Sequence, residues 1–207
     1  MFSLLSSIII TNTIYLILGK LFTKTNIKNL KSFSEIAING FIYLSLIALL
    51  INFFIPLDVK TNTLTLIIIC FFFLLKKKSF QKKELLILTI ITFFCFFLIL
   101  LDTVNRPDAG LYHLPFIKIL NEEKIIFGLA NLHSRFGHIS IIQYSSAINN
   151  NIFYGNVGIL IPLISIYSFL VFYFLGDILN FLLDNNKKNY NFLSIIFSSF
   201  ILLYISY

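Results

Sequence analysis

The sequence of 207 residues contains no tryptophan, only two cysteines and only nine acidic residues. Two cysteines without framework spacing exclude a disulfide scaffold, and we interpret Cys70 and Cys95 as small fillers within apolar segments. The sequence also lacks a Cys/His cluster with metal-ligand spacing, a glycine-rich phosphate loop and a Gly-x-Ser-x-Gly motif. No basic segment precedes the first apolar run, so we expect no cleaved secretory signal. These absences exclude the commonest motif-bearing soluble enzymes.

Hydrophobic residues make up 58% of the chain, phenylalanine alone occurs 25 times, and the mean hydropathy is +0.91. A soluble domain of this length cannot bury so much apolar surface, because its surface must remain largely polar. A membrane-spanning helix needs about 20 apolar residues, and the sequence supplies several such runs. We therefore predict an all-α, polytopic helical membrane protein.

Six apolar segments predict six spans, separated by short polar stretches. The third is short: it either spans the membrane with help from flanking polar residues and a snorkelling Lys76, or forms a re-entrant hairpin. We divide the chain into four spans (1–101), a long polar loop (102–152) and two further spans (153–207). The predicted spans are 4–19, 36–57, 63–75, 85–101, 157–176 with a continuation to 183, and a last one from 192 that still runs at 207.

The lysines predict the orientation of these spans, because short cytoplasmic loops collect basic residues. Eleven of the 16 basic residues fall in the loops after spans one, three and five, which we assign to the cytoplasm. The N-terminus and the long loop then face outward, in what we expect to be a bacterial inner membrane. Anionic lipid headgroups explain the net charge of +7, so we expect no nucleic-acid partner. The five outward basic residues are Lys60, Arg106, Lys118, Lys124 and Arg135.

The long loop contains all three histidines and both arginines of the chain. Apolar residues at helical spacing (Leu111, Leu114, Ile117 and Leu120) predict a first helix on the membrane surface, which Asp108 can cap. Pro115 is expected to kink this helix or to separate two shorter turns. A shaped turn is expected over 131–138, with glycines at 128 and 137. A second interfacial helix over 139–148 should end at the asparagines 149–151.

The polar residues of this loop suit transfer chemistry on a lipid-linked phosphate. Asp108 can act as a general base or hold a divalent ion, and it can equally serve only as a helix cap. Arg135 and Arg106 can bind a phosphate, because a guanidinium offers a planar pair of donors. The other predicted contacts to substrate are Tyr112, on the same helical face as Asp108, and the histidines His113, His133 and His138. Each histidine alone can also be an ordinary interfacial polar group.

Two motifs, Pro107-Asp108-Ala-Gly-Leu-Tyr112-His113-Leu-Pro115 and Asn131-Leu-His133-Ser-Arg135-Phe-Gly137, carry a family resemblance over about 50 residues. The loop resembles the outer loop of polytopic GT-C-type glycosyltransferases, which include protein-mannosyltransferase-like enzymes and bacterial relatives. The resemblance implies a helical membrane fold, a polyprenyl-phosphate-linked sugar donor and a catalytic role for Asp108. It implies that the sugar passes to an acceptor on the outer side of the membrane.

Two other classes of function stay open at this stage. A transporter or lipid-binding scaffold without catalysis would use the loop only to gate or dock a substrate. Transporters place ionisable groups near the middle of their spans, whereas the predicted spans are nearly free of charge, and this pattern favours chemistry in the loop. Because the last apolar segment still runs at Tyr207, we also expect a partner chain or a further C-terminal part.

Overall fold

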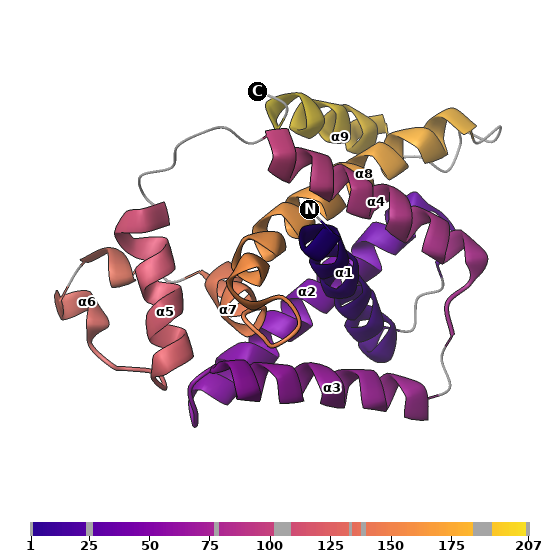
Figure 1. The fold of residues 1–207 in the computed structure, drawn as a ribbon. Helices are drawn as coiled ribbons and strands as arrows, with labels where there is room; N and C mark the ends of the chain where they lie inside the picture. Colours follow the sequence, from indigo (N-terminus) through magenta and orange to yellow (C-terminus); the bar gives the residue numbers. More distant parts are fainter. Residues whose placement is uncertain are drawn as a thin grey trace.

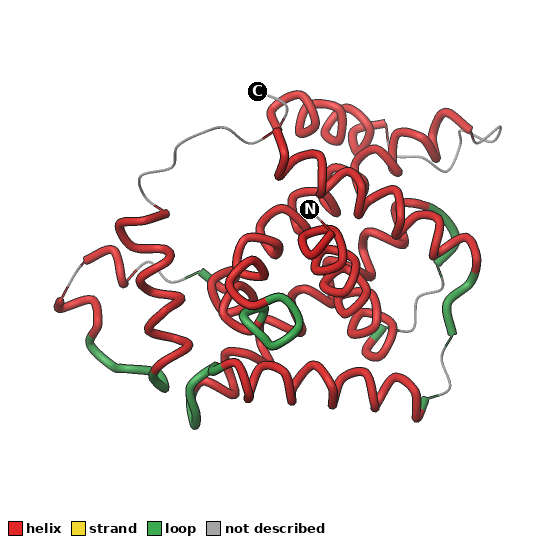
Figure 2. The backbone as a smooth tube through the Cα atoms, viewed as in Figure 1, coloured by secondary structure: helices red, strands yellow, loops and turns green. Residues whose placement is uncertain are grey.

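The computed structural model describes residues 2–23, 27–76, 79–101, 109–132, 134–137, 140–183 and 192–205, and every regular element in these ranges is helical (Figures 1 and 2). The prediction of an all-α chain is thereby confirmed. The elements are α1 (Phe2–Phe22), α2 (Leu30–Asn52), α3 (Val59–Leu75), α4 (Lys82–Leu101), the π-helical turn η1 (Ala109–His113), α5 (Leu114–Glu122), α6 (Leu129–Leu132), the 3₁₀ turn η2 (Ser134–Gly137), α7 (Ile141–Ile148), the 3₁₀ turn η3 (Gly155–Leu160), α8 (Ile161–Leu183) and α9 (Phe192–Ile205).

Among the described residues, four helices are long and apolar enough to cross a membrane, as expected of a helical membrane protein. They correspond to α1, α2, α4 and the continuous helical segment formed by η3 and α8, at Ser3–Phe22, Leu30–Asn52, Lys82–Leu101 and Gly155–Leu183. Helix α3 is apolar but has only 17 residues, about three short of the usual spanning length. It is one unbroken α-helix, so the re-entrant hairpin that the sequence left open is wrong.

Helix α2 lies at the centre of the bundle, where it packs against α1, α7 and α8. Its crossing with α1 is close, because a methyl group on Gly19 would overlap the carbonyl oxygen of Ile36, and one on Gly40 would overlap that of Tyr15. The ring of Tyr15 meets the rings of Phe41 and Phe169 edge to face, at centroid distances of 5.5 and 6.3 Å. Glycine at the crossing thus permits the backbone contact that small residues provide between membrane helices.

The boundaries predicted for the second span, 36–57, are wrong, because α2 begins at Leu30 and ends at Asn52. The Asn29 side chain accepts a hydrogen bond from the Ser32 backbone N–H, and the Ser32 hydroxyl oxygen accepts one from the Asn29 N–H. This capping box starts the helix within a polar stretch that hydropathy assigns to a loop. The other long helices lie within a few residues of their predicted positions, and α8 does continue to Leu183.

The long loop folds into the short helices α5, α6 and α7, which lie beside the long helices (Figure 1). The change from the π-helical turn η1 to α5 falls at Leu114, next to Pro115, so the predicted break is confirmed. Leu111 leaves the apolar face because a π turn has a wider spacing than an α turn, and both Leu111 and Leu114, the first residue of α5, are exposed. The buried residues of α5 are Phe116, Ile117 and Leu120, and this face packs against α7.

The predicted second interfacial helix exists as α7, but its expected place on the membrane surface is wrong. Every residue from Gln143 to Ile148 is buried, because α7 packs against α2, α5 and α8. In Figure 1, α7 lies between α5 and α2. It therefore joins the surface helix α5 to the centre of the bundle. The turn predicted over 131–138 is helical where it is described, as the one-turn helix α6 and the 3₁₀ turn η2, and Gly128 precedes α6 with a positive φ of 86°.

Several lysines meet at one end of the bundle, where α1 and α3 end and α2 and α4 begin. Lys20 binds the Glu84 carboxylate at 2.8 Å, and Lys31 binds that of Asp177 at 2.6 Å. Lys76 and Lys83 donate to backbone carbonyls across this end, at Leu21 and Lys28. We call it the lysine end; the opposite end carries α5 and α7.

Candidate functional site

Three residues predicted to bind substrate, Tyr112, His113 and Arg135, lie together at the N-terminal end of α5. The rings of Tyr112 and His113 have centroids 4.1 Å apart. The Arg135 guanidinium carbon lies 5.0 Å from the centroid of the Tyr112 ring, a cation–π geometry. Arg135 is exposed and the other two are half-buried. We call these residues the Arg135 cluster.

Gln143 of α7 sets the tautomer of His113. Its Oε1 accepts a hydrogen bond from the Ser140 backbone N–H at 3.0 Å, which fixes the orientation of the amide. The amide nitrogen Nε2 then lies 2.9 Å from Nδ1 of His113. Because an amide N–H only donates, His113 Nδ1 must accept, and the ring proton of the neutral imidazole is on Nε2. His113 thus offers an N–H donor next to Tyr112, the residue whose ring the Arg135 guanidinium also contacts.

Sequence reasoning did not select Gln143, although a signal was present. Ser140 and Gln143 have the spacing of a capping box, and the structure contains both of its hydrogen bonds at the start of α7. The remaining predicted site residues, Arg106, Asp108, His133 and His138, lie outside the described residues. Their assigned roles stay predictions. Among the described residues, no group of three or more potential ligands is placed to hold a metal ion.

Two asparagine amides fasten α5 and α7 to the start of α3. The two N–H groups of the Asn62 amide in α3 are shared among the carbonyls of Leu57, Ala147 and Asn150, which lie 2.7, 2.9 and 2.7 Å from its nitrogen. Asn121 of α5 donates to the carbonyls of Leu57 and Ala147, at 2.7 and 3.0 Å. Each of these two carbonyls therefore accepts from two side chains. Because Asn62 is fully buried, its hydrogen bonds are shielded from water. We call Asn62, Asn121 and the carbonyls of Leu57 and Ala147 the knot, which connects the loop helices to the bundle.

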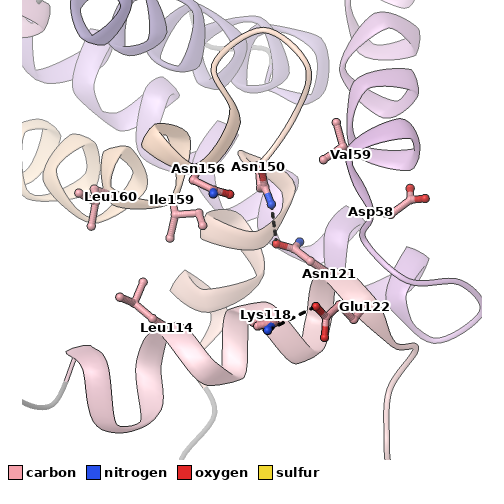
Figure 3. Close-up of a pocket in the computed structure, with 10 residues that line it drawn as sticks. All are labelled: Asp58, Val59, Leu114, Lys118, Asn121, Glu122, Asn150, Asn156, Ile159 and Leu160. Atoms are coloured by element: carbon pink, nitrogen blue, oxygen red, sulfur yellow. Dashed lines mark hydrogen bonds and ion pairs between the residues drawn. The ribbon is translucent and has the colours of Figure 1, made fainter.

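A hollow of about 610 Å³ lies beside this knot, between α5 and η3 (Figure 3). The Asn150 amide nitrogen donates to Oδ1 of Asn121 at 2.9 Å on the side nearest the knot. Lys118 and Glu122 form an ion pair at 3.8 Å along α5. The lining residues are Asp58, Val59, Leu114, Lys118, Asn121, Glu122, Asn150, Asn156, Ile159 and Leu160.

Asp58 at the rim of the hollow is an N-cap with a lowered pKa. Its Oδ1 accepts a hydrogen bond of 2.7 Å from the backbone N–H of Thr61, in the first turn of α3. This backbone hydrogen bond stabilises the carboxylate and is the main reason why the pKa of Asp58 falls below its ordinary value. The side chain therefore remains negatively charged near neutral pH.

A buried polar network links α1 to α7 below the loop helices, and sequence reasoning missed it. The hydroxyls of Tyr15 and Ser145 are 2.9 Å apart, and the Asn149 amide nitrogen donates to the Tyr15 oxygen at 3.3 Å. Oδ1 of Asn149 accepts from the hydroxyls of Tyr154 and Thr11 at 2.9 and 3.2 Å. Because these buried groups bind one another, a polar helix such as α7 can enter the apolar bundle without unpaired side chains at these positions.

The ion pair between Lys31 and Asp177 joins three helices at the lysine end. Asp177 of α8 also accepts hydrogen bonds from Ser194 and Ser198 of α9, at 2.7 and 3.0 Å. Lys31 lies in the first turn of α2, and its ammonium nitrogen is 5.1 Å from the centroid of the Tyr173 ring. This charged group holds α9 against α8 and α2.

The described part of the chain therefore defines a class, a helical membrane protein with a compact polar site at one end of its bundle. The family model for the Domain of unknown function (DUF8201) matches residues 1–207, and the chain belongs to that family. No curated protein and no solved structure matches the chain.

Proposed function

We propose that the protein is a membrane glycosyltransferase of the GT-C type, or part of one, which takes a sugar from a polyprenyl-phosphate donor. The observation that carries this proposal is the meeting of Arg135, Tyr112 and His113 at one exposed place. A guanidinium and a neutral imidazole N–H together offer several donors to one phosphate, and hydrogen bonds to a charged oxygen are stronger than those between neutral groups. A phosphate held there would be stabilised as it leaves the sugar.

In the proposed reaction, a hydroxyl oxygen of the acceptor attacks the anomeric carbon of the donor sugar. The bond between that carbon and the phosphate oxygen breaks, and the lipid phosphate leaves with the electron pair. Asp108 takes the proton of the attacking hydroxyl as a general base. The donors of Arg135 and His113 offset the charge that develops on the leaving phosphate.

We propose six spans, with the lysine end in the cytoplasm and the Arg135 cluster outside, in a bacterial inner membrane. In this topology α3 and α9 are the third and sixth spans. The gathering of Lys20, Lys31, Lys76 and Lys83 at one end supports it, because the positive-inside rule places such an end in the cytoplasm. A cysteine in place of Lys60 should react with an impermeant maleimide in intact cells, and one in place of Lys83 only after permeabilisation. The reverse pattern would contradict this orientation.

The lysine end also bears on the alternative of a transporter. The ion pair of Lys31 and Asp177 lies where α2 begins and in the last turns of α8, near one end of the bundle. A charge pair that serves transport is expected nearer the middle of the membrane. The ionisable groups of the described long helices therefore favour chemistry at the loop helices over a transmembrane pathway.

Sugar transfer in membrane vesicles tests the proposal. With a radiolabelled polyprenyl-phosphate hexose, we expect Asp108→Asn to abolish transfer while donor binding is retained. Arg135→Lys keeps the charge but loses the planar pair of donors, so donor affinity should fall about tenfold. Lys124→Gln, in the same segment of chain, removes an exposed charge away from the Arg135 cluster and should change neither quantity. Normal transfer by Asp108→Asn, or unchanged donor affinity in Arg135→Lys, would contradict the assigned roles.

A further inference from the structure

The hollow between α5 and η3 offers polar groups that the proposed phosphate contacts do not use. One wall is a face of α5 with Leu114, Lys118 and Glu122, and the other is formed by Asn156, Ile159 and Leu160 (Figure 3). Its volume of about 610 Å³ is within the usual range of small-molecule sites, ~300–1,000 Å³. The hollow begins at Leu114, the residue that follows His113 of the Arg135 cluster.

The groups around the hollow do not select an anion. Lys118 is already paired with Glu122 at 3.8 Å, and the Asp58 carboxylate at the rim adds a negative charge. This charge balance contrasts with the Arg135 cluster, which contains a guanidinium and an N–H donor. A phosphate would be attracted to the cluster and not to the hollow, because a carboxylate repels it.

The polar groups of the hollow both donate and accept hydrogen bonds. Asn156 is exposed, and its amide makes no hydrogen bond to another described residue. Lys118 can donate and Glu122 can accept from the same face of α5. A hydroxyl group both donates and accepts, so it pairs with an amide or with a Lys–Glu pair without a net charge. The apolar side chains of Leu114, Ile159 and Leu160 complement a C–H surface.

We infer that this hollow is a binding site for a neutral saccharide. Its shape is stabilised on one side by the hydrogen bonds of Asn121 to Leu57, Ala147 and Asn150, so the site is formed before a ligand arrives. The saccharide is the acceptor of the transferred sugar, and this role rests on the proposed function. The binding itself does not depend on transfer. The donor phosphate thus binds at the positively charged Arg135 cluster. The acceptor hydroxyls bind in the neighbouring hollow, where the Asp58 carboxylate disfavours an anion.

Direct binding of simple sugars tests this inference. The probes are the methyl glycosides of glucose, galactose, mannose and N-acetylglucosamine, with the full chain in lauryl dimethylamine oxide, a detergent without a sugar headgroup. Saturation-transfer NMR should detect binding of at least one probe. Asn156→Leu and Glu122→Gln should each weaken it about fivefold, because the first removes a hydrogen-bonding amide and the second replaces a charged acceptor with a weaker neutral one. Glu123→Gln is the matched control, since Glu123 is exposed and does not line the hollow.

The outcomes separate this inference from the proposed function. No saturation transfer to any probe would overturn the inference, and so would binding that Asn156→Leu and Glu122→Gln leave unchanged. Stronger binding of glycerol phosphate than of every neutral probe would also overturn it. Arg135→Lys should leave saccharide binding unchanged while it weakens donor binding. If saccharide binding follows the expected pattern but no sugar transfer occurs, the site stands and the proposed function fails.

Discussion

The amide nitrogen of Gln143 donates a hydrogen bond of 2.9 Å to Nδ1 of His113, and this contact joins the start of α5 to the buried helix α7. Because the other end of the same amide accepts from the Ser140 backbone, the orientation of Gln143 is not free to change. Gln143, which completes the capping box of α7, therefore also determines which ring nitrogen of His113 bears the proton.

Replacing Gln143 with Glu should change the protonation of His113. A carboxylate can still accept from the Ser140 N–H, as in a normal capping box, but its other oxygen only accepts. His113 must then donate from Nδ1, so the proton leaves Nε2 or the ring becomes an imidazolium. The ¹⁵N shifts of the His113 ring should report this change near neutral pH, with His113→Gln used to assign the signals. Ring shifts identical to those of the wild type would contradict the tautomer assigned here.

Replacing Gly40 with Ala should destabilise the crossing of α1 and α2. The added methyl group would overlap the backbone carbonyl of Tyr15, which cannot rotate away, so the helices must separate. We expect a loss of about 1–3 kcal/mol in the free energy of unfolding, measured as a lower unfolding temperature in detergent. Gly110→Ala is the control, because a methyl group at Gly110 meets no atom within 4 Å. Equal unfolding temperatures for the two variants would show that this crossing is looser than described.

Replacing Asn62 with Leu should weaken the attachment of the loop helices. The change removes donors to the carbonyls of Leu57, Ala147 and Asn150 and leaves buried backbone acceptors with fewer partners. We expect a loss of about 2–4 kcal/mol in the free energy of unfolding. Lys60→Leu, at an exposed position of the same helix, should have little effect. Hydrogen exchange of the α5 and α7 amides should rise only in Asn62→Leu, and protection at the wild-type level would contradict the knot.

The lowered pKa of Asp58 predicts that the free energy of unfolding depends on pH. Because its folded pKa is below the ordinary value, its carboxylate stabilises the folded state above the ordinary carboxyl range. This stability is lost as the pH falls through that range and through the lowered folded pKa. Asp58→Asn retains a capping side chain without a titrating group, so its unfolding temperature relative to wild type should rise as the pH falls. A constant difference between the two proteins from about pH 6 to about pH 3 would contradict this role.

The long apolar helices could be predicted because hydropathy alone determines them, as for α4 and α8. The start of α2 could not, because the capping box of Asn29 and Ser32 extends the helix into a polar stretch that hydropathy ignores. The burial of α7 could not be predicted, because the partners of its polar residues are distant in sequence. Ser145 and Asn149 are paired with Tyr15, more than 100 residues away, and only the tertiary fold brings them together.

The candidate site, like the fold, could be predicted only in part. Rarity of arginine and histidine was enough to select Arg135 and His113, and the described structure brings both to Tyr112. The hollow was not predicted, because its walls come from α5 and η3 and its rim from the start of α3. No local pattern links Asn156 to Lys118. A site built from side chains of separate helices becomes visible only when the helices are placed.

Asn52, the last residue of α2, contacts the chain on both sides of the exposed Lys124. Its amide donates to the Glu123 carbonyl at 3.0 Å, and its own carbonyl accepts from the Ile125 backbone N–H at 2.9 Å. A protease that cut after Lys124 would therefore leave both new ends bound to the same asparagine. We expect the two pieces to stay associated without a covalent link. A gene divided at this peptide bond should therefore give two separately expressed pieces that assemble.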